Sequence, residues 1–164
     1  MKKIIVIRGN SGSGKSTIAN EVLRKFDRGN LLIPQDFVRR QMLWVKDGPN
    51  NKSVSLFNNM IEYGFNNCDI VILEGIFVAE WYMEVFKKIK ELYKDNVYAY
   101  YLDVDFEETL KRHVTKPNCK DFGEKEMREW WREKDLVPIF NEKLIPQELT
   151  LTQTVDFIVQ DVQK

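Results

Sequence analysis

The stretch RGNSGSGKST, residues 8–17, follows the apolar run KIIVI at residues 3–7 and holds three glycines within six positions. Glycine lets the backbone curl so that successive N–H groups point at one anion. Residues 16–26 then show helical spacing of apolar side chains, and the start of a helix adds the positive end of its dipole. A buried strand, this loop and a helix together predict a phosphate-binding site.

Residues 9–16 match the pattern G-x-x-x-x-G-K-[ST] in full, and they lie between an expected strand and an expected helix, as the pattern requires. Lys15 is expected to reach the β- and γ-phosphates as a point charge, and Ser16 to hold Mg²⁺. The alternative is a flexible turn whose lysine faces solvent. The residues predicted to bind ATP here are Gly9, Asn10, Ser11, Gly12, Ser13, Gly14, Lys15, Ser16 and Thr17.

The base of the nucleotide is predicted to be adenine. A GTP-binding switch protein would need a guanine-reading N-K-x-D string after a later strand. The nearest string is NCKD at residues 118–121, which has the wrong order and lies in a basic loop. ATP is therefore the expected co-substrate, with Mg²⁺ as its metal ion.

Length and composition describe one globular domain, residues 1–164, with 43% hydrophobic and 30% charged residues. The 25 basic and 25 acidic residues leave a formal net charge of zero, which argues against a dedicated nucleic-acid or membrane-surface binder. No apolar run approaches the roughly 20 residues that span a bilayer. The apolar N-terminal run reaches Arg8 too soon for a signal peptide, and Cys68 and Cys119 lack metal-site spacing. We expect a cytoplasmic protein with free thiols.

Apolar strands alternate with helical patterns along the chain. Because such strands form a parallel sheet covered on both faces, the sequence predicts a doubly wound α/β fold of the P-loop NTPase, kinase type. The expected strands lie at 3–7, 30–34, 69–75, 96–104 and 142–148. The expected helices lie at 16–26, from 36, at about 54–65, and at 79–95, 105–114, 124–135 and 152–162, with a loop at 46–53 as a candidate hinge.

Asp36 follows the second expected strand, at the edge of the sheet where open α/β folds bind ligands. A carboxylate there could accept the proton of an attacking hydroxyl in phosphoryl transfer. The alternative is that Asp36 only caps the helix that begins at Phe37.

The segment PQDFVRRQML, residues 34–43, resembles the one that polynucleotide-kinase and zeta-toxin-like enzymes carry after their second strand. These belong to the small P-loop kinases of the nucleoside-monophosphate-kinase type, which the chain resembles in layout over most of its length. The resemblance implies that Asp36 is catalytic and that Arg39 assists it. Arg40 competes with Arg39 for that role and is otherwise a candidate substrate contact.

A second acid, Glu74, ends the strand at 69–75 and precedes Gly75. A carboxylate beside a phosphate site is tolerated next to a metal ion, and the resemblance implies that Glu74 lies near Mg²⁺ or its waters. A turn cap is the alternative. The resemblance also implies a short, basic and helical lid at about residues 112–125, with Arg112 and Lys116 on the phosphates. Lysine lacks the bidentate fork of arginine, and a solvated basic loop is the alternative.

The function that these residues predict is transfer of the γ-phosphoryl group of Mg-ATP to a hydroxyl of a small, nucleoside-like or other, acceptor. Phe37, Trp44 and Phe57 are candidate walls of its pocket, with core packing as the alternative. The segment at 126–134 is predicted to be a packed helix with one tryptophan inward. The competing functions are a polynucleotide 5′-hydroxyl kinase and a non-catalytic ATP-binding switch. The sequence does not indicate an oligomeric state.

Overall fold

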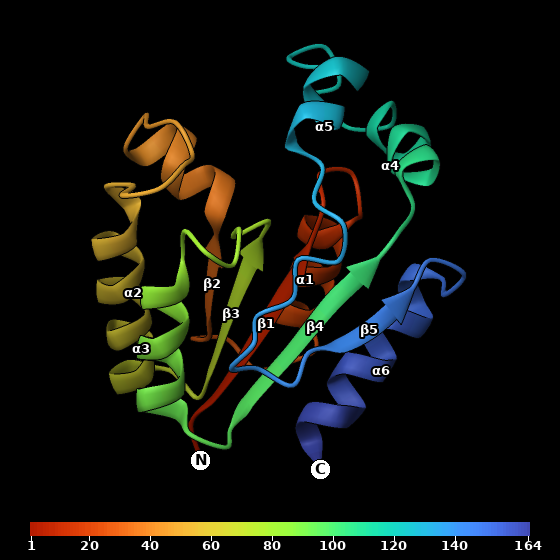
Figure 1. The fold of residues 1–164 in the computed structure, drawn as a ribbon. Helices are drawn as coiled ribbons and strands as arrows, with labels where there is room; N and C mark the ends of the chain where they lie inside the picture. Colours follow the sequence, from red (N-terminus) through yellow and green to blue (C-terminus); the bar gives the residue numbers. More distant parts are fainter.

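The computed structural model describes residues 1–164 as one α/β sandwich around a parallel sheet (Figure 1). The strands are β1 (Lys3–Gly9), β2 (Leu31–Pro34), β3 (Ile70–Gly75), β4 (Val97–Asp103) and β5 (Lys143–Pro146). Their order across the sheet is β2-β3-β1-β4-β5, and every neighbouring pair is parallel. The carboxyl ends of all five strands therefore meet at one edge, and both chain termini lie at the opposite edge.

Helices cover both faces of the sheet. The pair α2 and α3 packs on one face, and the pair α1 and α6 on the other, whereas α4 and α5 stand above the carboxyl edge. None of the helices combines the length and the apolar character that crossing a bilayer requires. The helices are α1 (Lys15–Arg24), η1 (Phe37–Met42), α2 (Ser53–Asn67), α3 (Met83–Tyr93), α4 (Phe106–His113), α5 (Glu124–Trp130) and α6 (Leu151–Gln163).

The residues of β1 explain why the fold is doubly wound. Side chains alternate between the two faces of a strand, so a run without polar residues must be buried twice. Ile4 and Val6 belong to the core under α2 and α3, and Ile5 and Ile7 belong to the core under α1 and α6. All four are fully buried. The predicted fold class is confirmed.

Two predicted helices are shorter than expected. The helix predicted at 79–95 begins only at Met83, because residues 78–82 form a turn in which the N–H of Trp81 and of Tyr82 both donate to the carbonyl of Val78. The helix predicted at 124–135 ends at Trp130, and residues 131–142 run from the carboxyl edge down over one face of the sheet to β5 as an irregular strap. This strap places side chains at the site described below.

Arg8, the last side chain of β1 before the glycine loop, is fully buried and ties the strap to the sheet. Its guanidinium donates to Glu142 at 2.9 Å, to Asp135 at 2.9 Å and to the carbonyl of Phe77 at 2.9 Å. A buried charge is tolerated when its hydrogen bonds are satisfied in this way. Arg8 thus fixes the strap and the turn after β3 next to the loop.

Replacing Arg8 with Met should destabilise the fold by about 3–5 kcal/mol, because it leaves the carboxylate of Glu142 buried without its cation. Urea unfolding at pH 7 measures the difference. The matched control is Arg24→Met, which removes an exposed ion pair with Glu21 and should change stability by no more than about 0.5 kcal/mol. Equal effects of the two substitutions would contradict a structural role for the Arg8 network.

Candidate functional site

The loop between β1 and α1 is curled, and α4 packs closely against it. Gly12 has φ +81°, and a Cβ there would lie 2.6 Å from the carbonyl oxygen of Thr109 in α4. A side chain is therefore excluded both by backbone conformation and by space. The N–H of Ser13 closes the turn by donating to the carbonyl of Asn10, and the first turn of α1 follows directly, as the predicted phosphate cradle requires.

Lys15 lies inside this cradle, almost fully buried. Its ammonium donates to the carbonyl of Asn10 at 2.8 Å and to the hydroxyl of Ser13 at 3.4 Å. Burial lowers the pKa of Lys15 to about 8, against the opposing attraction of Glu74. A cation that has lost its hydration gains most from an anion brought next to it, so this environment favours phosphate oxygens.

Glu74 faces Lys15 and the start of α1 from the end of β3. Its Oε1 accepts a hydrogen bond from the hydroxyl of Ser16 at 3.0 Å. Burial raises the pKa of Glu74, while the charge of Lys15 opposes the shift. Gly75 then permits the close approach of β2, because a Cβ would lie 2.4 Å from Cβ of Gln35.

Glu74 and Ser16 fit the donor set of Mg²⁺ in nucleotide sites, where the ion takes few protein oxygens and completes its shell with water and phosphate oxygens. A buried carboxylate beside a hydroxyl offers those oxygens, and burial raises the pKa of Glu74 because the charged form has lost hydration. The two residues expected near the metal ion are thus in contact with each other.

Asp36 stands at the start of η1, a segment with the wide turns of a π-helix, in which the N–H of Leu43 donates to the carbonyl of Val38. The carboxylate makes no capping hydrogen bond to the helix, so the capping alternative is wrong. Asp36 is exposed and instead accepts a hydrogen bond from Arg39 at 3.3 Å. Arg39 is buried and also donates to the carbonyl of Val45 at 3.0 Å.

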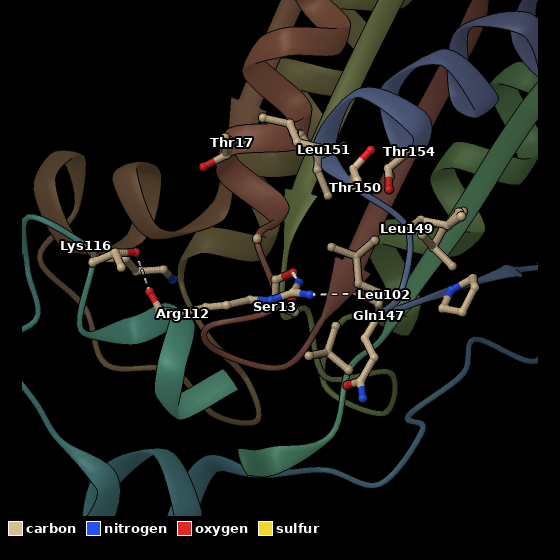
Figure 2. A pocket seen from close by; sticks show the side chains of 16 residues that line it. Ser13, Thr17, Leu102, Arg112, Lys116, Gln147, Leu149, Thr150, Leu151 and Thr154 are labelled. Carbon is tan, nitrogen blue, oxygen red and sulfur yellow. Dashed lines mark hydrogen bonds between the residues drawn. The ribbon is translucent and has the colours of Figure 1, made fainter. Parts of the chain in front are cut away.

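A first cavity of about 360 Å³ lies on one side of the loop, against α1, α6 and the turn after β5 (Figure 2). Arg112 of α4 reaches along its floor and donates to the carbonyl of Ser13 at 3.0 Å and to that of Gln147 at 3.2 Å. Figure 2 shows Thr17, Leu149 and Thr150 around the same space. The lining mixes apolar side chains with hydroxyl, amide and basic groups, a combination that can take both the base and the ribose of a nucleotide.

A second cavity of about 440 Å³ lies on the other side of the loop, under the predicted lid. Ser11 is the loop residue that reaches it, whereas Ser13 and Gly14 face the first cavity. Asp36, the candidate general base, lies in the wall of this second cavity. The phosphate loop therefore lies between the first cavity and the cavity that contains Asp36. Its lining is Ser11, Asp36, Arg39, Arg40, Lys46, Asp47, Ile76, Val78, Trp81, Phe122, Glu129, Trp130 and Arg132.

The predicted lid begins where α4 ends. The carbonyl of Phe122 lies 2.8 Å from Nε2 of His113, which closes residues 113–122 into a loop at its base. Lys116 lies on this loop and lines the first cavity. Burial lowers the pKa of Lys116, and the nearby charges of Asp36 and Glu74 oppose the shift. The charge of Lys116 is therefore influenced by both predicted carboxylates, although its ammonium makes no ion pair with either.

None of the three aromatic side chains predicted as pocket walls lines the second cavity. Trp44 points into solvent and is 89% exposed, Phe57 is buried in the core under α2, and Phe37 is half exposed. The cavity takes its aromatic walls instead from Trp81, Phe122 and Trp130. The prediction that the helix at 126–134 only packs inward is also wrong, because Met127 is its buried side chain and Trp130 lines the cavity.

No protein-family model matches the chain, and no significant relative was found among curated proteins. Solved structures do match over nearly its whole length. A gluconokinase from Sinorhizobium meliloti 1021 is 14% identical, with 98% of this chain and 91% of that chain covered and a TM-score of 0.65. The APS kinase of Mycobacterium tuberculosis, solved with AMPPNP and APS, is 13% identical over 99% and 98% of the two chains, with a TM-score of 0.65.

A third structure, a shikimate kinase from Acinetobacter baumannii in complex with shikimate, is 15% identical and covers 99% of this chain and 92% of that chain, with a TM-score of 0.57. At these identities the likeness shows the fold. The chain has the fold of P-loop kinases, and this part of the resemblance is confirmed. The narrower likeness to nucleoside-monophosphate kinases, polynucleotide kinases and zeta-toxin-like enzymes stays a prediction.

Substituting Lys15 with Ala should leave the fold intact and weaken Mg-ATP binding at least tenfold, because the cradle loses its only buried ammonium. Calorimetric titration with Mg-AMPPNP measures the affinity. Lys25→Ala, at the exposed end of the same helix, is the control and should bind as the unmodified protein does. Unchanged affinity in the Lys15 variant would contradict the phosphate-cradle assignment.

Residues 112–125 should become resistant to limited proteolysis when Mg-AMPPNP binds, since Arg112 and Lys116 gain phosphate contacts and order the loop between them. Trypsin can cleave after Arg112, Lys120 and Lys125, whereas Pro117 blocks cleavage after Lys116, and mass spectrometry identifies the fragments. Cleavage at equal rates with and without the nucleotide would count against a lid at this place.

Proposed function

We propose that this chain is an ATP-dependent kinase that transfers the γ-phosphoryl group of Mg-ATP to a hydroxyl of a small molecule. The observation that carries the proposal is the position of the phosphate loop between two cavities, one of which contains Asp36. Phosphoryl transfer needs a donor and an acceptor on opposite sides of the γ-phosphate, in line with each other. The two cavities supply those two places.

On the donor side, the triphosphate would follow residues 9–17, and the base and ribose would occupy the first cavity beside Arg112 and Gln147. Ser16 and Glu74 would hold Mg²⁺, which neutralises phosphate charge when it is bound. Lys15 and Lys116 would add two positive charges around the phosphates. Both have lost hydration by burial, so both gain from the incoming anion.

On the acceptor side, Asp36 would accept the proton of the substrate hydroxyl while the hydroxyl oxygen bonds to the γ-phosphorus. The bond between that phosphorus and the β–γ bridging oxygen breaks, ADP leaves, and the proton passes from Asp36 to solvent. Arg39 orients the carboxylate through its 3.3 Å hydrogen bond and is itself anchored on Val45. Arg39 is therefore proposed as a positioning residue rather than one that touches the acceptor.

The fold neighbours support this proposal in their named activities. Gluconokinase and shikimate kinase are kinases of small molecules, and the APS kinase structure holds a nucleotide analogue and APS together. A non-catalytic nucleotide switch gains nothing from a carboxylate in a second cavity. The carboxylate of Asp36 is exposed and does not cap the helix, which favours an enzyme over a switch.

Replacing Asp36 with Asn should lower phosphoryl transfer by about 10²–10⁴-fold, the usual contribution of a positioned acid or base, and keep Mg-ATP affinity within a few-fold. Transfer from γ-labelled ATP is measured with panels of nucleosides, sugars, hydroxy acids and oligonucleotides. The control is Asp95→Asn, at an exposed position outside both cavities. A full transfer rate in the Asp36 variant would contradict its catalytic role.

The oligonucleotide arm of the same assay separates a small-molecule kinase from a polynucleotide kinase. Binding along several phosphates of a strand weakens steeply with salt, because condensed counterions are released. We expect weak oligonucleotide binding and little 5′-phosphorylation, since the formal net charge is zero and Arg39 is already hydrogen-bonded. Tight, salt-dependent binding with efficient 5′-phosphorylation would replace the small acceptor with a nucleic-acid end.

A further inference from the structure

Two arginines of the second cavity have no hydrogen-bonded carboxylate. Nε of Arg40 lies 3.8 Å from Asp36, and Nη1 of Arg132 lies 3.7 Å from Glu80, both beyond hydrogen-bond reach. Each side chain is more than a third exposed. The other arginine of the cavity, Arg39, is buried and already bonded to Asp36 and Val45. Arg40 and Arg132 therefore keep donors free for a ligand.

Aromatic rings hold both of these guanidinium groups in place. Arg40 lies 5.6 Å from the ring centre of Phe122 and 5.8 Å from that of Trp130. Arg132 lies 5.0 Å from the ring centre of Trp81. Stacking on a ring uses the face of the guanidinium and leaves its in-plane N–H groups available for a planar oxyanion.

The main chain at Arg132 is fixed by the phosphate loop itself. The side-chain amide of Asn10 accepts a hydrogen bond from the N–H of Arg132 at 2.9 Å and donates to its carbonyl at 2.6 Å. Asn10 is buried, so this two-point contact is shielded from water. A side chain whose backbone is held in this way loses less entropy when it binds a ligand.

The remaining charges of the cavity leave it with free positive groups. Of its carboxylates, Asp47 already accepts from the hydroxyl of Tyr82 at 2.5 Å and from the N–H of Gly48 at 3.0 Å, and Asp36 accepts from Arg39. With Glu129, the lining holds three carboxylates against four cations, namely Arg39, Arg40, Lys46 and Arg132, so it carries one excess positive charge. An uncharged ligand would leave that excess charge uncompensated.

We propose that the acceptor is an anionic alcohol, with a carboxylate or phosphate bound by Arg132 and Arg40 and its reacting hydroxyl directed to Asp36. This inference rests on the proposed kinase function and narrows its substrate class. Guanidinium groups bind either oxyanion through paired, charge-assisted hydrogen bonds. Neutral nucleosides and sugars fill the same volume but leave the two arginines unpaired, so they bind more weakly.

The test compares matched pairs that differ in one charged group: gluconate with glucose, shikimate with its methyl ester, and uridine 5′-monophosphate with uridine. The protein is first saturated with Mg-AMPPNP, so that the phosphate loop is filled and anions report on the second cavity. Calorimetry gives the dissociation constant of each compound, and Mg-ATP then replaces the analogue to measure kcat/KM. The carboxylate pairs and the phosphate pair distinguish the two kinds of oxyanion.

We expect the compound that binds most tightly to be an anion, with an affinity at least tenfold higher than that of its neutral partner. Arg132→Met should weaken the binding of that anion by about ten- to hundredfold, the effect of removing one partner of a charge-assisted hydrogen bond. The affinity of Arg132→Lys should lie between those of Arg132→Met and the unmodified protein. Arg40→Met should act in the same direction. The control is Arg128→Met, which lies outside the cavity, donates to Glu124 and stacks on Phe106.

The outcomes separate this inference from the proposed function. Transfer to neutral compounds at equal or higher kcat/KM would overturn the anionic acceptor and leave the kinase intact. The anionic acceptor is equally overturned if no anion binds more tightly than its neutral partner, or if the preference survives in the Arg40→Met, Arg132→Met double variant. Failure of the protein to bind Mg-AMPPNP at all would overturn both.

Discussion

The rest of the site depends on one buried charge, the ammonium of Lys15. A cation removed from water needs oxygen atoms around it, and here the carbonyl of Asn10 and the hydroxyl of Ser13 accept from it, while the nearby charge of Glu74 favours its protonated form. That requirement forces the chain after β1 to curl around the lysine. It also forces β3 to end with an acid beside β1, which the register pairing Ile7 with Glu74 achieves. A phosphate site follows from the same arrangement, because phosphate oxygens satisfy this cation better than a carbonyl does.

The curled loop also divides the sheet edge into two sides. Ser13 and Gly14 face one cavity and Ser11 faces the other, so a phosphate held by the loop would be reachable from both. Arg112 and Asn10 connect the loop outward in opposite directions, Arg112 through Gln147 toward α6 and Asn10 through Arg132 toward α5. The two cavities are thus connected through the loop by a few hydrogen bonds.

The sequence alone was sufficient where a signal is local. The glycine loop, Lys15 and the apolar strands are contiguous patterns, and they predict the fold class and the phosphate cradle. Ser16 and Glu74 were each expected near Mg²⁺, and the two side chains lie 3.0 Å apart, whereas their role as metal ligands stays a prediction. The two arginines after Asp36 could not be told apart in sequence, yet the wide turns of η1 bury Arg39 and leave Arg40 at the cavity. Backbone geometry of that kind has no clear signature in residue types.

The acceptor side was not predictable in the same way, because its parts come from distant segments. Arg132 meets Asn10 across 122 positions of sequence, Trp81 lies in the turn before α3, and Trp130 is the last residue of α5. Aromatic residues near Asp36 in sequence gave the wrong walls, since Trp44 turns outward at φ +49° and Phe57 points into the core. The tryptophan pair at 130–131 was the one sequence signal for an aromatic cavity wall. Its interpretation as helix packing led away from that conclusion.

The central claim is that one cavity takes the nucleotide and the other takes the acceptor, with the phosphate loop between them. Hydrogen–deuterium exchange with Mg-AMPPNP alone tests it most directly, because amide protection locates a bound ligand on the chain. We expect slower amide exchange in residues 10–17, 112–116 and 146–151 when Mg-AMPPNP binds. Exchange in residues 36–47 should change little until an acceptor is added. Nucleotide-induced protection centred on residues 36–47 and 129–132, with none at 146–151, would contradict it.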